Sequence, residues 1–543
     1  MNKLLLILTS KTTFFILTTL LILGLNLFPL ISHIKHAPPG RTFGLIHNNV
    51  QDFYFYQSLM NEGANGSWLT YDPYTSENHK PSVIFSYFLA LGKVSSLLGL
   101  SNAVTYHLLR IILGFLFLLA SYFLILNFSS FHRKLTYLLF LFAAPLMNGD
   151  KPFMNWWTGV DPIRRVAYLP HHMAGSLLLV LSIIFLIKFF KSGHNKYLLY
   201  AIVIAPILAF IHTPSLFILL LILPPTLGLQ IALKHLAGGR LIPLSGRSHD
   251  SREVEKPIIG LLVYCLIGFF LLILMVSLTK TGFPWSQYID WEKRLQFPLD
   301  KELIGALGYL FPFALIGGIK AVLSKRFDLI LIFCWLFIPI LFIPFAPRLN
   351  ISNIRLIQGT PYLPLAILAV MGIITIEKFL KKFSRLLCYC VTVLLALLFI
   401  IFTYPTLSWS LKDQIREYWP IFGNVYLDNR LKYAFEFINK NFPAHTVTLA
   451  TFYTGNYLPA STNTVSFIGH FGYTYNIDEK QTSVQKFFEN KMLEKEAKEY
   501  LLNNKITLVF QGPEEKPIYK DKLYPEILKP VYDKEEVTLY VLK

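Results

Sequence analysis

Apolar segments of membrane-spanning length alternate with polar loops from residue 12 to residue 404. An α-helix needs about 20 predominantly apolar residues to cross a bilayer core, and the pattern predicts about 11 such helices. The predicted spans are residues 12–31, 104–128, 135–147, 172–190, 197–212, 213–236, 258–278, 303–323, 327–345, 360–376 and 386–404. The third span is short, and it is retained because the basic loops would otherwise fall on both sides of the membrane.

Basic residues are concentrated in alternate loops between these segments. These loops are residues 133–134, 188–196, 234–256, 320–326 and 378–385. Cytoplasmic loops of membrane proteins carry an excess of Lys and Arg, so this distribution predicts a cytoplasmic N-terminus. The predicted external segments are the first loop, 32–103, three later loops, 148–171, 280–302 and 346–359, and the tail after residue 404.

The composition agrees with an integral membrane protein. Hydrophobic residues make up 54% of the chain and charged residues 15%, with a mean hydropathy of +0.49. Soluble domains carry about 25% charged residues. The net charge of +18 is explained by the basic loops, so no nucleic-acid partner is indicated. The cysteines all lie in apolar segments, which indicates neither a disulfide framework nor a cysteine metal site: Cys265, Cys334, Cys388 and Cys390.

The tail has the alternating pattern of a small α/β domain. Helical spacing covers residues 429–441 and 484–502, and strand-like runs cover 446–452, 464–468, 506–510 and 537–542. Strands that alternate with helices favour an α/β layer. We therefore expect a transmembrane domain, residues 1–405, with its first external loop 32–103, and an extracytoplasmic α/β domain, residues 406–543. The sequence of the tail has no Gly-rich phosphate loop.

The first external loop contains the candidate catalytic residue. Asp52 and Tyr56 are four residues apart, on one face of a predicted helix that Gly63 and Gly66 end. A second helix, residues 83–100, is moderately apolar and is expected to lie along the membrane surface. A lone loop aspartate is more often a helix cap or a solvated acid than a catalyst, so the catalytic interpretation depends on the motifs around Asp52.

Several short motifs occur along the chain: Asp52-x-x-x-Tyr56, Gly63-x-x-Gly66, Lys80-Pro81, Arg110 in the second span, the late segment from Arg355 to Pro364, Tyr453-Thr454-Gly455-Asn456, Gly469-His470 and Gln511-Gly512. Together they resemble the GT-C superfamily of membrane glycosyltransferases, in particular the protein mannosyltransferase and aminoarabinose transferase branch and its uncharacterised bacterial members. The resemblance covers the chain loosely from end to end. In the mannosyltransferases a second acid follows the first, whereas Phe53 follows Asp52 here.

The resemblance implies a multi-pass enzyme of the cell membrane. It would move a sugar from a polyprenyl-phosphate donor to a lipid, glycan or protein acceptor outside the cytoplasm, commonly with inversion. Inversion needs a carboxylate to accept the proton of the acceptor hydroxyl, and Asp52 is the candidate. The leaving phosphate needs cationic partners, for which Arg355 is the first choice. Further candidate substrate-binding residues are Arg348, Arg164, Arg165, His171, Tyr56 and Lys80.

Simpler roles remain open for several residues. Arg355 and Arg348 lie where a cation at a helix end reaches the membrane interface. Asp161 is expected to pair with Arg164 or Arg165, and His470 is expected to be structural. No external loop has the DxD triplet of a divalent-metal site, and His171-His172 has no third ligand at a suitable spacing, so no metal or other cofactor is firmly implied.

Two other functions are alternatives to the transferase. A transporter or flippase of lipid-linked glycans typically has ionisable residues and broken helices at mid-membrane, often in two related halves. The predicted spans are almost free of charge, Arg110 and Lys320 lie toward span ends, and the sequence has no convincing internal repeat. These features favour the transferase. The remaining alternative is a non-catalytic GT-C-like membrane protein whose tail is a binding module.

Overall fold

The structure is a computed structural model that describes residues 11–128, 132–235, 252–416 and 422–543. Most of the basic loop 234–256 lies outside the described residues. The chain divides into two compact units. The helical unit comprises Met1–Phe28, Leu109–Ser277 and Ile289–Gln414, and the mixed unit comprises Pro29–Leu108, Leu278–Tyr288 and Ile415–Lys543.

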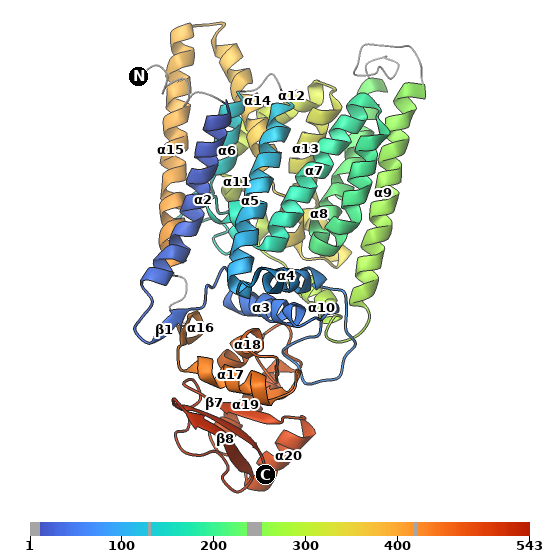
Figure 1. Ribbon diagram of the computed structural model, residues 1–543. Helices are drawn as coiled ribbons and strands as arrows, with labels where there is room; N and C mark the ends of the chain where they lie inside the picture. Colours follow the sequence, from blue (N-terminus) through green and yellow to red (C-terminus); the bar gives the residue numbers. More distant parts are fainter. Residues whose placement is uncertain (1–10, 129–131, 236–251, 417–421) are drawn as a thin grey trace. The chain divides into compact units, whose positions relative to one another are not determined.

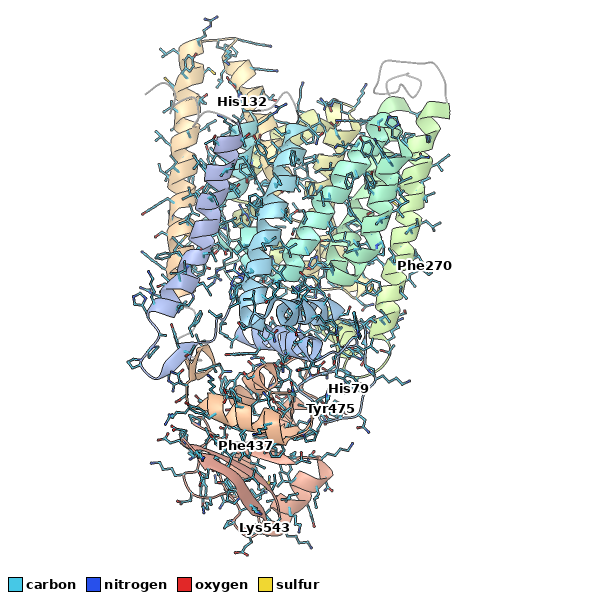
Figure 2. The ribbon with its side chains drawn as sticks, in the orientation of Figure 1. His79, His132, Phe270, Phe437, Tyr475 and Lys543 are labelled. Atoms are coloured by element: carbon cyan, nitrogen blue, oxygen red, sulfur yellow. The ribbon has the colours of Figure 1, made fainter. Side chains whose placement is uncertain are left out.

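Nine helices among the described residues are long and apolar enough to cross a membrane. Large apolar side chains are exposed along them, such as Phe270, which is 66% exposed (Figure 2). The fold is therefore that of a polytopic α-helical membrane protein. The nine are α2 (Lys11–Lys35), α5 (Asn102–Leu126), α7 (Pro170–Ser192), α8 (Asn195–His235), α9 (Arg252–Thr279), the segment Glu302–Leu323 that ends in α12 (Phe311–Leu323), α13 (Phe327–Phe342), α14 (Tyr362–Leu380) and α15 (Arg385–Arg416) (Figure 1).

Helix α8 accounts for two of the predicted spans. Its 41 residues form two helices that meet at His212, whose backbone is not helical (φ −153°, ψ 76°). Pro214 follows closely, and a proline inside a helix removes a hydrogen bond and clashes with the preceding turn. The predicted boundary between residues 212 and 213 therefore falls at the kink.

The third predicted span, residues 135–147, is shorter in the structure than expected. Helix α6 (Arg133–Phe142) has 10 residues, which corresponds to about 15 Å. The hydrocarbon core of a bilayer is about 30 Å thick. Because α6 is half that length, it is not one of the nine candidate spans in the described part of the chain.

Close backbone contacts hold helices of the helical unit together. Helix α12 packs against α14, and α7 packs against α8. A Cβ atom added at Gly317 would lie 1.8 Å from Leu368 O, and one at Gly372 would lie 2.0 Å from Phe313 O. Small residues permit this approach, which supplies the packing that helices in lipid depend on. Shorter elements between the spans are β2 (Met147–Asn148), β3 (Lys151–Pro152), η1 (Thr158–Val160), η2 (Arg164–Ala167), α10 (Gln287–Arg294), α11 (Leu299–Leu307), η3 (Gly308–Leu310), η4 (Ile343–Phe345), η5 (Pro347–Leu349) and η6 (Asn353–Ile357).

The mixed unit contains two helices of the first loop, α3 (Val50–Ala64) and α4 (Ser86–Leu98). They also meet backbone to backbone. A Cβ at Gly63 would lie 2.1 Å from Leu89 O, and one at Gly92 would lie 1.9 Å from Met60 O. Helix α3 ends at Ala64, within the break that Gly63 and Gly66 predict.

Segments from the first loop and the tail form one antiparallel ladder in this unit. Strand β1 (Arg41–Phe43) pairs with β4 (Tyr426–Asp428), and Thr42 lies opposite Leu427. The Tyr54 hydroxyl of α3 donates to Asn424 O at 2.5 Å. The first loop and the beginning of the tail are therefore parts of one folded piece.

The rest of the tail is a five-stranded sheet in the order β6-β5-β7-β9-β8 with helices packed on it. Strand β5 is parallel to β6 and β7, whereas β9 is antiparallel to β7 and β8. Side chains such as Leu449, Phe487, Val509 and Tyr540 form its core. This confirms a small C-terminal α/β region. Its elements are α16 (Phe422–Val425), α17 (Leu431–Asn441), β5 (Val447–Leu449), α18 (Phe452–Ser461), β6 (Val465–Ser466), α19 (Ile477–Phe488), α20 (Glu494–Asn503), β7 (Leu508–Gln511), β8 (Leu528–Lys534) and β9 (Val537–Leu542).

The tail differs from the expectation in several details, and the pattern did not predict strand β8. The predicted helix 484–502 is two helices, α19 and α20, because the chain turns between them at Asn490, whose φ is 53°. The predicted strand 446–452 ends at Leu449, and Phe452 begins α18. Helix α18 was not expected, since Gly455 and Pro459 are residues typical of loops.

Candidate functional site

The first turn of α3 positions Asp52. The N-cap residue Asn49 accepts hydrogen bonds at Oδ1 from the backbone N–H groups of Gln51 (2.9 Å) and Asp52 (3.2 Å). An Asn at this position satisfies N–H groups that have no partner within the helix. Helix capping is thus performed by Asn49, and the Asp52 side chain, which is 41% exposed, is left for another role.

His470 is the side chain that holds Asp52. His470 Nε2 lies 3.3 Å from Asp52 Oδ1. The backbone N–H of Gly472 donates to His470 Nδ1 at 3.0 Å, so Nδ1 is an acceptor and the ring proton is on Nε2. His470 therefore donates to the Asp52 carboxylate. The sequence pattern indicated only a structural role for His470, because the two residues are 418 positions apart and neither has a local motif that reports the contact.

Two buried acids lie in the same unit, and sequence reasoning missed both. Burial raises the pKa of Glu62 to about 8. Burial also raises the pKa of Asp72 well above its usual range, and the neighbouring Glu62 raises it further. Glu62 Oε2 and Asp72 Oδ2 are buried without a hydrogen-bond partner among the described residues. Both acids are more stable in the protonated form when the unit is folded.

The other two candidates of the first loop have simple contacts. The Tyr56 ring is buried and stacks on Phe88 of α4, with 4.2 Å between ring centroids. The Lys80 side chain is exposed, and its backbone carbonyl accepts a hydrogen bond from Trp285 Nε1 at 2.9 Å. Tyr56 thus packs α3 against α4, while Lys80 remains accessible to a ligand.

In the helical unit, Arg355 has a carboxylate partner. Its Nε donates to Glu292 Oε1 at 2.8 Å, and its Nη1 donates to Gln358 Oε1 at 3.2 Å. The guanidinium also lies 5.3 Å from the centroid of the Trp291 ring. Glu292 of α10 was not among the predicted residues. Its pairing with Arg355 means that a phosphate would have to share or displace this carboxylate.

Arg164 and Arg348 differ in burial. Arg164 is 7% exposed, lies 3.6 Å from Asp161 and donates to Asp413 Oδ2 at 2.7 Å. The expected pairing of Asp161 with an arginine is thereby confirmed. Arg348 is exposed, and its guanidinium lies 5.8 Å from the Phe345 ring.

Arg165 is the candidate that faces a cavity. Its guanidinium donates to the carbonyls of Phe140 (2.8 Å) and Val160 (3.2 Å) and lies 3.9 Å from the centroid of the Tyr362 ring. Burial lowers its pKa to about 10, so it is still a cation at neutral pH. No carboxylate in the described residues forms an ion pair with it. Arg165 is thus a buried cation with neutral partners.

The cavity beside Arg165 has a volume of about 50 Å³. This is room for a small polar group or several waters. Its polar lining includes Arg165, His172, Gln358 and Thr360, and its aromatic walls include Trp157. Gln358 also accepts a hydrogen bond from Arg355, so this side chain joins Arg355 to the cavity wall.

Histidines lie beside this cavity. The rings of His171 and His172, at the start of α7, have centroids 4.5 Å apart, and the His172 and His212 rings are also 4.5 Å apart. His212 shares a hydrogen bond of 2.8 Å with Ser215. Within the described ranges, no group of three or more His, Cys, Asp or Glu residues has a geometry that could hold a metal ion.

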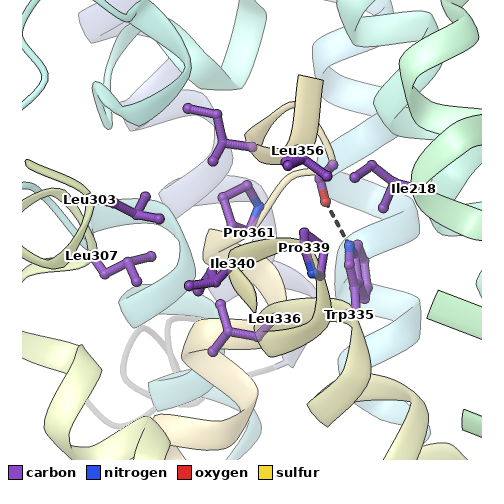
Figure 3. A pocket seen from close by; sticks show the side chains of 11 residues that line it. Ile218, Leu303, Leu307, Trp335, Leu336, Pro339, Ile340, Leu356 and Pro361 are labelled. Atoms are coloured by element: carbon purple, nitrogen blue, oxygen red, sulfur yellow. Dashed lines mark hydrogen bonds between the residues drawn. The ribbon is translucent and has the colours of Figure 1, made fainter. Parts of the chain in front are cut away.

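A second, smaller cavity of about 10 Å³ is almost entirely apolar. Leu303, Leu307 and Leu336 line it, and Trp335 Nε1 donates to Gly359 O at 2.6 Å on its edge (Figure 3). Ile357 and Pro361 line both cavities. A cationic polar cavity and an apolar one thus share a wall in the helical unit.

Comparisons with solved structures define the class of fold. No protein-family model matches the sequence, and no curated protein matches it. The oligosaccharyltransferase AglB of Archaeoglobus fulgidus, in complex with an inhibitory peptide and a dolichol-phosphate, is similar with a TM-score of 0.54 and 12% identity. The match covers 98% of this chain and 74% of that chain.

Two further structures extend the comparison. An oligosaccharyltransferase from the same organism, tethered to an acceptor peptide containing the NVT sequon, has a TM-score of 0.56 at 12% identity, over 98% of this chain and 74% of that chain. ArnT from Cupriavidus metallidurans, bound to undecaprenyl phosphate, has a TM-score of 0.48 at 11% identity, over 96% of this chain and 97% of that chain. The oligosaccharyltransferase matches show that this chain shares the fold of these structures over nearly its whole length.

Proposed function

We propose that this protein is a GT-C-type glycosyltransferase that moves a sugar from a polyprenyl-phosphate donor to an acceptor outside the cytoplasm. The observation that carries the proposal is a half-exposed carboxylate, Asp52, that caps no helix and receives a hydrogen bond from His470, in a chain with this fold. The dolichol-phosphate in the complex of the similar AglB is a carrier of the kind that the proposed donor requires.

The proposed reaction is an inverting transfer. The Asp52 carboxylate accepts the proton of the acceptor hydroxyl while the hydroxyl oxygen bonds to the anomeric carbon of the sugar. The bond between that carbon and the phosphate oxygen breaks, and the carrier phosphate leaves with the electron pair. Charge develops on this phosphate, so cationic donors near it lower the barrier.

Arg165 is the preferred residue for binding the phosphate. It is a cation bound only to neutral groups, in the wall of a cavity that also has His172 and Gln358 as lining residues. Arg355 and His171 are secondary candidates, and Arg348, Arg164, Tyr56 and Lys80 are the remaining ones.

The proposed topology follows from the basic loops. The N-terminus is cytoplasmic, the membrane domain covers residues 1–405, and the α/β domain 406–543 is extracytoplasmic together with the first loop, residues 32–103. The acceptor is a glycan, lipid or protein of the cell envelope, because such molecules are present on that side.

The test is a transfer assay with the purified full-length protein in lipid nanodiscs. A panel of radiolabelled polyprenyl-phosphate sugars is offered with a cell-envelope extract as the source of acceptor. The wild-type protein is expected to transfer label from one of these donors, and Asp52→Asn is expected to abolish transfer while the protein still inserts and accumulates. Asp150→Asn, an exposed acid of another predicted external loop, is the matched control. Transfer at the wild-type rate by Asp52→Asn would refute the mechanism.

A further inference from the structure

The contact between His470 and Asp52 joins the tail to the first loop at the candidate catalytic acid. His470 Nε2 is 3.3 Å from Asp52 Oδ1, and His470 is 8% exposed while Asp52 is 41% exposed. The histidine is therefore buried behind the carboxylate, and the carboxylate is the part of the pair that solvent and ligands reach.

The His470 ring is fixed on its faces. It packs against Tyr74, Phe55 and Tyr473, with centroid distances of 5.6, 5.8 and 4.5 Å. The Tyr74 hydroxyl is itself anchored to Asn456 O at 2.8 Å. Three aromatic neighbours leave the ring little rotational freedom, so the direction of its Nε2–H is set by packing.

The loop that contains His470 is fixed by backbone hydrogen bonds as well. The backbone N–H groups of Gly469 and His470 both donate to Thr474 Oγ1 at 3.2 Å. The backbone N–H of Phe471 donates to Gln51 Oε1 at 3.1 Å. Since Gln51 is adjacent to Asp52 in α3, this hydrogen bond holds the His470 loop next to the helix turn that contains Asp52.

Both nitrogens of His470 are already used. Nδ1 accepts from the Gly472 backbone, and Nε2–H donates to Asp52. The ring has no lone pair left to accept a proton from an acceptor hydroxyl, so His470 itself is unsuited to be the base. Asp52 Oδ2 accepts no hydrogen bond from the described residues and remains able to accept that proton.

We infer that His470 is a positioning residue that orients the Asp52 carboxylate through the Nε2–H···Oδ1 hydrogen bond. This inference rests on the proposed function, and it assigns the C-terminal α/β domain a part in the transfer reaction. The hydrogen bond fixes one carboxylate oxygen and leaves the other available to the acceptor hydroxyl.

The experiment measures kcat and the KM for the acceptor separately for full-length His470→Ala and His470→Gln. Hydrogen bonds to charged groups are worth about 10- to 100-fold in an equilibrium or rate. His470→Ala is expected to lower kcat by about that factor and to leave the acceptor KM nearly unchanged, because orientation of the base matters in the transition state. His470→Gln keeps a side-chain N–H, and it is expected to recover most of the lost kcat.

The controls separate positioning from other roles. Phe471→Ala changes a 70% exposed side chain of the same loop and is expected to keep the wild-type kcat. An unchanged kcat in His470→Ala, or a loss of kcat that His470→Gln does not recover, would overturn the inference, because a merely structural role does not depend on a side-chain N–H. A loss in His470→Ala as large as that in Asp52→Asn would also overturn it. Failure of the wild-type protein with every donor refutes the proposed function instead.

Discussion

Arg355 donates from Nε to Glu292 Oε1 at 2.8 Å, so the guanidinium chosen first from sequence as a phosphate ligand is already paired with a carboxylate. The pair is only partly buried, at 24% and 19% exposure. Its contribution to stability is therefore modest, and Gln358 links Arg355 to the wall of the cavity beside Arg165.

We predict that Arg355→Ala lowers the free energy of unfolding by about 1 to 2 kcal/mol, because Glu292 is left with no cationic partner at Oε1. Adding Glu292→Gln to this variant is expected to recover most of the loss. Melting temperatures of the four proteins of this double-mutant cycle measure the interaction. Equal melting temperatures for Arg355→Ala and the double variant would contradict the prediction.

For Arg165 we predict an effect on donor use. Arg165→Ala is expected to raise the KM for the lipid donor about tenfold or more, since it removes a buried cation from the cavity. Arg165→Lys is expected to recover this only partly, because an ammonium cannot reproduce the fork that donates to the Phe140 and Val160 carbonyls. The measurement is initial rate against donor concentration.

Arg385→Ala is the control for this series, since its side chain is exposed and lies in a predicted cytoplasmic loop. It is expected to leave the donor KM within about twofold of wild type. A donor KM unchanged in Arg165→Ala would remove Arg165 from the phosphate site.

The raised pKa of Glu62 predicts that the stability of the protein depends on pH. Its pKa rises from 4.5 in the unfolded chain to about 8 in the folded unit because it is buried. The folded state therefore binds the proton more tightly. The free energy of unfolding falls as the pH rises from about 4.5, and the contribution of Glu62 is fully lost above about pH 8. Each pH unit between these two pKa values corresponds to about 1.4 kcal/mol, so the total is on the order of a few kcal/mol.

Glu62→Gln removes this titration while keeping the shape of the side chain. Its melting temperature is expected to exceed that of the wild type at pH 8 and to match it near pH 4.5. Thermal unfolding across this range is the measurement. Parallel curves for the two proteins would show that Glu62 ionises normally in the folded state.

Gly63 offers a test of the contact between α3 and α4. A Cβ there would lie 2.1 Å from Leu89 O, so Gly63→Ala must push the helices apart. We expect a loss of about 2 to 3 kcal/mol in stability together with a loss of activity, since α3 carries Asp52. Gly24→Ala is the control, because nothing lies within 4 Å of its Cβ position in α2. A normal melting temperature for Gly63→Ala would contradict the close approach.

The sequence predicted the features that depend on local pattern. Hydropathy located the helices that can span the membrane, and the residue pair at 212 and 213 located the kink of α8. The pattern of apolar and polar residues did not predict elements that depend on contacts between residues far apart in the sequence. Helix α18 forms despite Gly455 because that glycine lies against the backbone of Ile468, where a Cβ would be 1.9 Å from the carbonyl oxygen.

The candidate site was predictable only in part, for the same reason. Asp52 was chosen from its position after the first span, and its role stays a prediction. The contacts of His470 with Asp52 and of Glu292 with Arg355 were not predicted, because the partners lie far apart in the sequence. An ion pair or a histidine tautomer is set by the fold, and a single sequence carries no signal for it. Arg165 was only a secondary candidate, since nothing in its neighbourhood distinguishes it from Arg164.

The ladder between β1 and β4 has a consequence for how the protein is made. The first external loop with Asp52 is synthesised early. Its partners, strand β4 and His470, are synthesised near the end of the chain. Nascent chains that stop short of residue 470 lack this support for the acid. Premature termination thus yields a chain whose early hydrophobic segments can enter the membrane but whose Asp52 lacks the contact with His470.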